Sequence, residues 1–115
     1  MFSDHIHSLA PPGVTVEVVS LHGGQPWRAD PSEPIFAAAA RALERAFGRA
    51  PVYVREGGSI PIVQAFQETL QAPVVLLGFG LPGENAHAPN EWFSLDNYAR
   101  GAEAIAYLYD ELTGA

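Results

Sequence analysis

The chain has 115 residues, 48% of them apolar, which fits one small globular domain at most. Its formal net charge of -7 argues against nucleic acid or an anionic membrane surface as a partner. It contains no cysteine, which excludes a disulfide framework and a thiolate metal site and suits a cytoplasmic protein. No apolar run approaches the roughly 20 residues of a membrane-spanning helix, so we expect no membrane partner.

The N-terminal part of the sequence predicts a short helix, a strand and a linker. Apolar residues recur at helical spacing over residues 2–9, before a Pro-Pro-Gly sequence ends the helix. Residues 14–19 are rich in valine and alternate between two faces, which is typical of an antiparallel strand with one face in water. Residues 21–27 contain two glycines and a proline, which indicate a linker.

The histidines of this region are not predicted to bind a metal. His5 and His7 lie two residues apart and therefore do not share a helix face, as a ligand pair on a helix does. His22 stands alone in the linker, where we expect a solvated or structural role.

An amphipathic helix is predicted to open within residues 30–34 and to end at Gly48. The sequence DPSEP at residues 30–34 supplies capping residues and an early proline, and Gly48 follows the helix. The helix carries a full apolar stripe, made of Ile35, Ala38, Ala39, Ala42, Leu43, Ala46 and Phe47. Four charged residues fall off this stripe and are expected to form a solvated face: Arg41, Glu44, Arg45 and Arg49.

Two short apolar runs, at residues 52–54 and 73–77, flank a helix predicted over residues 60–70. A strand, a helix and a second strand in this order favour a right-handed crossover between parallel strands, so the predicted fold class is α/β. Ser59 is the expected N-cap of the helix, and Pro61 is tolerated in its first turn.

The turn before this helix contains Gly57, Gly58 and Ser59. Glycines allow the backbone to approach a ligand closely, and free N–H groups at a helix N-terminus bind anions such as a carboxylate. The same pattern also fits an ordinary strand-to-helix turn without a ligand.

A polar loop with the sequence ENAHAPNE, at residues 84–91, follows the second apolar run and a glycine-rich stretch. In α/β proteins, loops at the carboxyl ends of strands are where ligands and metals usually bind. His87 is therefore a candidate metal ligand, and Asn90 and Glu91 are candidates to orient it or its loop. The alternative is a solvated loop histidine. We expect Glu84 to be solvated.

The last helix is predicted to start after Ser94 as N-cap, with Asp96 in its first turn and Gly114 after its end. Tyr107 and Glu111 are expected to lie mostly outward, together with Asp110. The stripe that we expect to be buried consists of Leu95, Tyr98, Ala102, Ile105, Leu108 and Leu112.

Four segments, in their order and spacing, resemble the C-terminal catalytic region of the dinuclear zinc peptidases related to carnosinase, aminoacylase and glutamate carboxypeptidase (peptidase family M twenty). They are REGGSIP at residues 55–61, PVVLLGFGLP at 73–82, NAHAPNE at 85–91 and FSLDNYARG at 93–101. The resemblance covers nearly the whole chain. It implies that residues 1–29 are the end of a lid or dimerisation domain with its last strand and a linker. Residues 30–115 would be the C-terminal part of a catalytic domain with a partial parallel sheet.

The resemblance also implies a site. His87 would bind one of two zinc ions, while Gly57, Gly58 and Ser59 would bind the carboxylate of a peptide or N-acyl amino acid substrate. The family's other metal ligands and its general base have no counterpart in this sequence, although Glu56 lies near the right loop. We therefore expect no catalytic residue, at most one weak zinc site, and no hydrolysis by this chain alone.

Two other functions remain open from the sequence. One is a stand-alone module that binds small carboxylates, and the other is an interaction module whose sheet edge is completed by another chain. Strands that are apolar on both faces need more cover than so short a chain provides. We therefore expect a homo-oligomer or association with the upstream part of such an enzyme.

Overall fold

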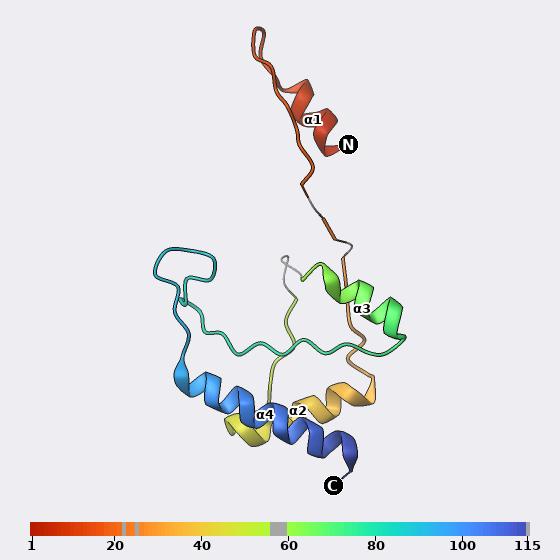
Figure 1. The fold of residues 1–115 in the computed structure, drawn as a ribbon, viewed down its shortest axis with the longest axis vertical. Helices are drawn as coiled ribbons and strands as arrows, with labels where there is room; N and C mark the ends of the chain where they lie inside the picture. The colour runs from red at the N-terminus through yellow and green to blue at the C-terminus, as the bar shows by residue number, and fades with distance from the viewer. Residues whose placement is uncertain (22, 25, 56–59, 115) are drawn as a thin grey trace.

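The computed structural model describes residues 1–21, 23–24, 26–55 and 60–114. Four helices form in these residues: α1 (Phe2–Ser8), α2 (Pro34–Phe47), α3 (Ile62–Leu70) and α4 (Leu95–Thr113). The molecule is elongated, with principal extents of 67 × 37 × 19 Å, because α1 and the segment after it extend away from the other three helices (Figure 1). Within the described part of the chain, no helix is both long enough and apolar enough to cross a membrane.

The ends of α2 and α4 confirm the predicted bounds. The side chain of Ser94 accepts a hydrogen bond from a backbone N–H in the first turn of α4 at 3.2 Å. Gly48 and Gly114 end the two helices in the left-handed conformation. Before α2, the carboxylate of Asp30 accepts one hydrogen bond from the backbone N–H of Ser32 and another from its hydroxyl. These two hydrogen bonds, the backbone one foremost, lower the pKa of the Asp30 carboxyl.

Helix α3 begins later than its sequence predicts. Its first residue is Ile62 and its N-cap is Pro61, so the helix starts two residues after the expected position. The expected N-cap, Ser59, lies outside the described residues. The C-terminal end at Leu70 agrees with the prediction.

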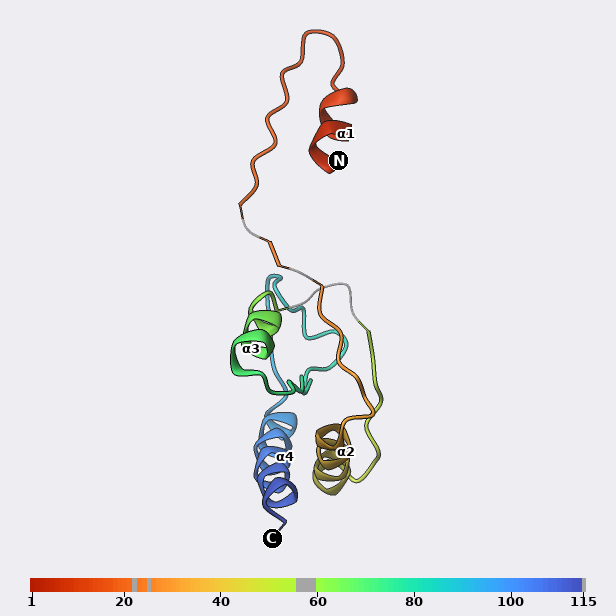
Figure 2. The ribbon, with the colours of Figure 1, turned by 90° about the vertical axis from the view of Figure 1, so that its right-hand side faces the viewer.

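The core lies between α2 and α4, which run side by side (Figure 2). On α4 the buried positions are Gly101 and Ala104, and the Ala104 side chain is 0% exposed. Small side chains allow two helices to approach closely, because the distance between helix axes depends on the residues at the contact. On α2 the buried positions are Phe36, Ala38, Ala39, Ala42 and Ala46.

Charged side chains border this contact. Arg41 and Glu111 form an ion pair at 2.6 Å, and Arg45 lies 3.6 Å from Asp110 and 3.8 Å above the centre of the Tyr107 ring. Tyr107 and Glu111 therefore face α2 instead of lying outward, and the two arginines of α2 do more than form a solvated face. Exposed ion pairs contribute at most about 1 kcal/mol each, so most of the stability of the pair comes from the apolar contact.

Phe79 joins the extended segment before α4 to the helix pair. Its ring stacks on Phe47 with ring centroids 6.0 Å apart. A Cβ atom at Gly101 would lie 3.2 Å from the same ring, so the glycine lets this ring pack directly on α4. The side-chain amide of Asn97 donates a hydrogen bond to the Phe79 carbonyl oxygen at 2.8 Å.

The predicted sheet is not confirmed in the described residues. Segments 14–19, 52–54 and 73–77 form no strands there, so neither the lid strand nor the parallel crossover is present. A strand exists only where a neighbouring strand supplies hydrogen-bond partners, and the backbone hydrogen bonds outside the helices do not link these segments. Residues 73–80 instead follow an extended path across the unit (Figure 1).

The apolar stripe that was expected to be buried on α4 is mostly exposed. Leu95 is 83% exposed and Tyr98 is 68% exposed, and only Leu108 of the stripe is half-buried. Helical periodicity identifies an apolar face, but it does not identify the neighbour that covers it. Here α2 covers the adjacent face, which leaves an apolar hollow of about 230 Å³ between the stripe and Phe79.

We expect Ala104→Leu to destabilise the α2–α4 pair by about 1–3 kcal/mol, because the added methylenes would enter a fully packed contact. Ala106→Leu is the matched control, since Ala106 is exposed on the same helix. Urea unfolding followed by circular dichroism measures the free energy of unfolding of both variants. Equal midpoints for the two variants would show that Ala104 is not at a close helix contact.

Candidate functional site

The candidate site is the loop of residues 84–92, here called the His87 loop, which closes on itself before α4 begins (Figure 1). The backbone N–H of Trp92 donates a hydrogen bond to the Glu84 carbonyl oxygen at 3.1 Å. The indole N–H of Trp92 donates to the Gly83 carbonyl oxygen, also at 3.1 Å. The two ends of the loop are therefore joined directly, as in an Ω-loop.

Glu84 is buried, which corrects the expectation that it is solvated. Its residue is 8% exposed, and among the described residues it is the only buried charged one. Its carboxylate Oε1 accepts a hydrogen bond from the backbone N–H of Ser94 at 3.3 Å. A buried carboxylate needs such donors, and the positive end of the α4 dipole at Ser94 also favours a negative charge.

His87 occupies a strained backbone position at the far end of this loop. The N–H of Ala88 donates to the Asn85 carbonyl oxygen at 2.8 Å, which makes His87 the third residue of a tight turn. The φ angle of His87 is 62°, and Asn85 and Asn90 also have positive φ angles, of 55° and 60°. Asparagine and histidine are both enriched in this left-handed region, which costs a residue with a Cβ atom on the order of 1–2 kcal/mol. The side chain of His87 is exposed.

His87 is the one histidine of this loop and the predicted metal ligand. Zinc needs at least three protein ligands, and no group of three His, Cys, Asp or Glu residues in the described chain lies close enough to hold a metal ion. Asn90 and Glu91 are exposed, and the hydrogen bonds found in the described loop do not join either side chain to His87. Their role in orienting His87 therefore stays a prediction.

The predicted carboxylate-binding residues Gly57, Gly58 and Ser59 lie outside the described residues, as do Glu56 and His22. The helix that follows this turn is described. The first turn of α3 and the His87 loop lie at the same end of the unit formed by α2, α3 and α4 in both views (Figures 1 and 2). The first turn of α3 and the His87 loop therefore lie at one edge of the molecule.

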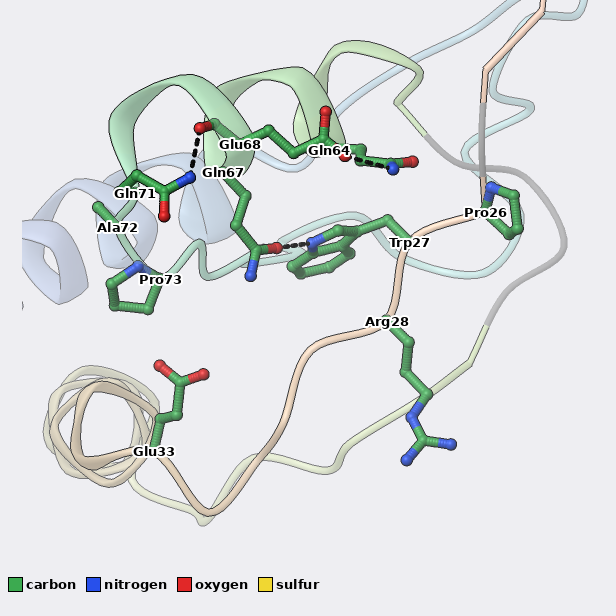
Figure 3. A pocket seen from close by; sticks show the side chains of 10 residues that line it. All are labelled: Pro26, Trp27, Arg28, Glu33, Gln64, Gln67, Glu68, Gln71, Ala72 and Pro73. Carbon is green, nitrogen blue, oxygen red and sulfur yellow. Dashed lines mark hydrogen bonds between the residues drawn. The ribbon is translucent and has the colours of Figure 1, made fainter.

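A polar cavity that the sequence did not predict lies between the linker and α3 (Figure 3). Its volume is about 580 Å³, and its lining includes Trp27, Arg28, Gln64 and Gln67. The Gln67 side chain reaches across to accept a hydrogen bond from the Trp27 indole N–H. The Oε1 atom of Gln64 is buried without a hydrogen-bond partner among the described residues. A tryptophan within a glycine-rich linker was the one available signal that this linker packs against the domain.

The linker approaches the start of α3 closely at Gly24. A Cβ atom at this position would lie 2.8 Å from the Cβ atom of Pro61, which is too close for any residue other than glycine without a shift. The linker therefore passes directly beside the N-terminus of α3.

Comparison with known proteins adds to this geometry. Residues 4–111 match the peptidase family M20/M25/M40. The chain is 36% identical over 93 residues to the Cys-Gly metallodipeptidase dug1 of Schizosaccharomyces pombe, which covers 81% of this chain and 20% of that protein. It is 35% identical over 96 residues to the Beta-Ala-His dipeptidase of Homo sapiens, which covers 83% of this chain and 19% of that protein.

A solved structure is also similar. The di-peptidase Dug1p from Saccharomyces cerevisiae matches with a TM-score of 0.75 and 35% sequence identity, over 80% of this chain and 19% of that chain. The chain therefore belongs to the peptidase family M20/M25/M40, which confirms the resemblance found in its four motifs. It spans about a fifth of the length of the curated relatives that it matches.

Proposed function

We propose that the chain is the C-terminal part of a zinc-dependent metallopeptidase of the dipeptidase, carboxypeptidase or amidohydrolase type. Its family and the names of its relatives, a Cys-Gly metallodipeptidase and a Beta-Ala-His dipeptidase, support this activity class. In this proposal, residues 1–29 end a lid or dimerisation domain and its linker. Residues 30–115 belong to the catalytic domain, and the substrate is a peptide or an N-acyl amino acid.

His87 is the metal ligand of this proposal, and one observation carries the assignment. Its backbone is held at a φ angle of 62° in a loop whose ends are hydrogen-bonded together. Backbone strain of this kind is retained only where surrounding contacts impose it, and it gathers at functional positions. The other ligands of the zinc ions would come from the rest of the enzyme.

Gly57, Gly58 and Ser59 are the proposed binding residues for the substrate carboxylate. Helix N-termini favour anions, and α3 begins without a side-chain cap among the described residues, although its Val63 N–H already donates to the Ile60 carbonyl oxygen. Peptide substrates of carboxypeptidases and dipeptidases end in a carboxylate, which matches this preference.

The partial parallel sheet also belongs to this proposal. Segments 52–54 and 73–77 are apolar, as strands buried between helix layers are. The match of the backbone to the Dug1p di-peptidase supports the view that these segments pair with strands from the rest of the enzyme. In the described residues they remain extended and unpaired because those neighbours are not among them.

The second candidate function is a non-catalytic module that binds small carboxylates or another protein. The polar cavity beside Trp27, with Arg28 and three glutamines in its lining, favours the binding of small carboxylates. The exposed apolar stripe of α4 favours the binding of another protein.

We expect the 115-residue chain to hydrolyse neither Cys-Gly nor β-Ala-His at any zinc concentration, because a catalytic zinc site needs three protein ligands and a base. A coupled assay for the released amino acid measures this. His87→Ala is the essential control. Zinc-dependent turnover that persists in His87→Ala would contradict both the metal-ligand assignment and the incomplete site.

We expect zinc binding to the chain to be weaker than about micromolar, because one imidazole contributes little of the ~10–16 kcal/mol available to closed structural sites. Isothermal titration calorimetry measures the affinity, and the signal should disappear in His87→Ala. His5→Ala is the matched control, since His5 is also exposed. Tight stoichiometric zinc in a monomeric sample would mean that the chain completes a site by itself.

We expect the chain to form homo-oligomers, or to bind the upstream part of its enzyme, because large apolar side chains of α4 and of residues 52–54 are uncovered. Size-exclusion chromatography with light scattering measures the mass. Replacing Leu95 and Tyr98 by glutamine should shift the mass toward the monomer. A wild-type chain that is a compact monomer with a cooperative melt would contradict this expectation.

A further inference from the structure

We propose that Glu84 is a positioning residue for His87: its buried carboxylate hydrogen-bonds the His87 loop to the start of α4 and so sets the direction in which the loop presents the imidazole. This inference rests on the proposed role of His87 as a metal ligand. It assigns a function to the one acidic residue near the loop that the sequence indicated to be solvated.

The first observation is the location of the carboxylate. Glu84 lies at the first position of the His87 loop, and its Oε1 accepts the backbone N–H of Ser94, two residues beyond the end of the loop. Glu84 therefore joins both ends of the loop through its side chain as well as through its carbonyl oxygen, which accepts from Trp92. Few other contacts hold the loop, because every residue from 85 to 92 is exposed.

The second observation is that the partner of Glu84 is a fixed point. Ser94 is the N-cap of α4, and its hydroxyl oxygen accepts the N–H of Asn97. Asn97 in turn donates to the carbonyl oxygen of Phe79, which is packed between α2 and α4. The hydrogen bond from Ser94 thus connects the loop to the best-packed part of the molecule.

The third observation is the space left for the carboxylate. A Cβ atom at Gly80 would lie 3.0 Å from the Oε2 atom of Glu84, which is tighter than ordinary van der Waals contact. Glycine at this position allows the acid to fold back beneath its own loop. An acid that only improved solubility would be exposed, as Glu91 is in the same loop.

The connection matters because the loop holds an unfavourable backbone conformation. Three of its residues, including His87, have positive φ angles without being glycine. Such a turn persists when its ends are held and relaxes when they are released. Without the carboxylate of Glu84, we expect the loop to sample conformations in which the imidazole points in other directions.

The experiment measures the imidazole of His87 directly, in the metal-free 115-residue chain. Long-range proton–nitrogen NMR spectra report the ring shifts of its histidines, and His87→Gln assigns the relevant signals. Heteronuclear NOE values of residues 85–91 report the order of the loop. Glu84→Ala removes the acceptor, whereas Glu84→Gln keeps an oxygen that accepts the Ser94 N–H. Glu103→Ala, which removes an exposed acid of α4, is the control for charge.

A second pair of variants tests the donor. Ser94 has a φ angle of -70°, which proline also adopts, so Ser94→Pro removes the N–H at a compatible φ angle. Both Ser94→Pro and Ser94→Ala lose the hydroxyl cap, but only Ser94→Ala keeps the N–H. The difference between the two variants isolates the hydrogen bond to Glu84.

We expect Glu84→Ala and Ser94→Pro to move the His87 ring shifts toward those of the exposed His5 and His7 and to lower the NOE values of the loop. Glu84→Gln and Glu103→Ala should keep the wild-type values, with unchanged helix content by circular dichroism, and Ser94→Ala, which loses only the cap, should change them less than Ser94→Pro does. The proposal is overturned if Glu84→Ala leaves the His87 signals in place. It is also overturned if Glu84→Gln changes these signals as much as Glu84→Ala does and Ser94→Ala changes them as much as Ser94→Pro does.

Adding zinc to the same samples separates this proposal from the proposed function. If the wild-type His87 signals do not respond even to zinc in the millimolar range, where a single imidazole should bind, the metal-ligand role fails while the result for the loop stands. The opposite outcome is that the wild-type His87 signals respond to zinc, while metal-free Glu84→Ala has the ring shifts and loop order of the wild type. The positioning role then fails and the metal-ligand role stands.

Discussion

The close contact between α2 and α4 is the interaction on which the rest of the structure depends. It is made by alanine and glycine, so the helices approach closely and bury little side-chain volume. Phe79 is held between this pair, and the His87 loop begins five residues later. The position of His87, the candidate ligand, therefore depends on the contact between α2 and α4, which lies some distance from it. A core of this size also explains why so many large apolar side chains stay exposed.

The His87 loop combines local strain with restraint at its ends. Its interior contains three residues with positive φ angles, and its ends are joined through Glu84, Trp92 and Ser94. A strained backbone whose two ends are held by hydrogen bonds is typical of a loop that keeps one residue in a fixed orientation. In the proposed function the loop presents His87 as one ligand, and the remaining ligands come from other parts of the enzyme.

The uncovered surfaces agree with the proposal that this chain is part of a larger catalytic domain. It spans about a fifth of the length of its relatives, and its match to a solved di-peptidase covers most of its own length. The apolar stripe of α4 and the segments at 52–54 and 73–77 are exposed or unpaired in the described residues. These are the surfaces that neighbouring strands and helices would cover in a larger domain.

The sequence by itself determined the helices and the family. Helix ends depend on residues within about four positions of one another, so the roles of Ser94 and Gly114 were readable directly. The four motifs identified the family because their order and spacing are specific. Only the tertiary structure decided that Glu84 is buried and that α2 covers one side of α4, because both depend on residues distant in sequence. The strands show the same limit: an apolar run predicts extended backbone, but a strand forms only where another segment supplies its hydrogen bonds.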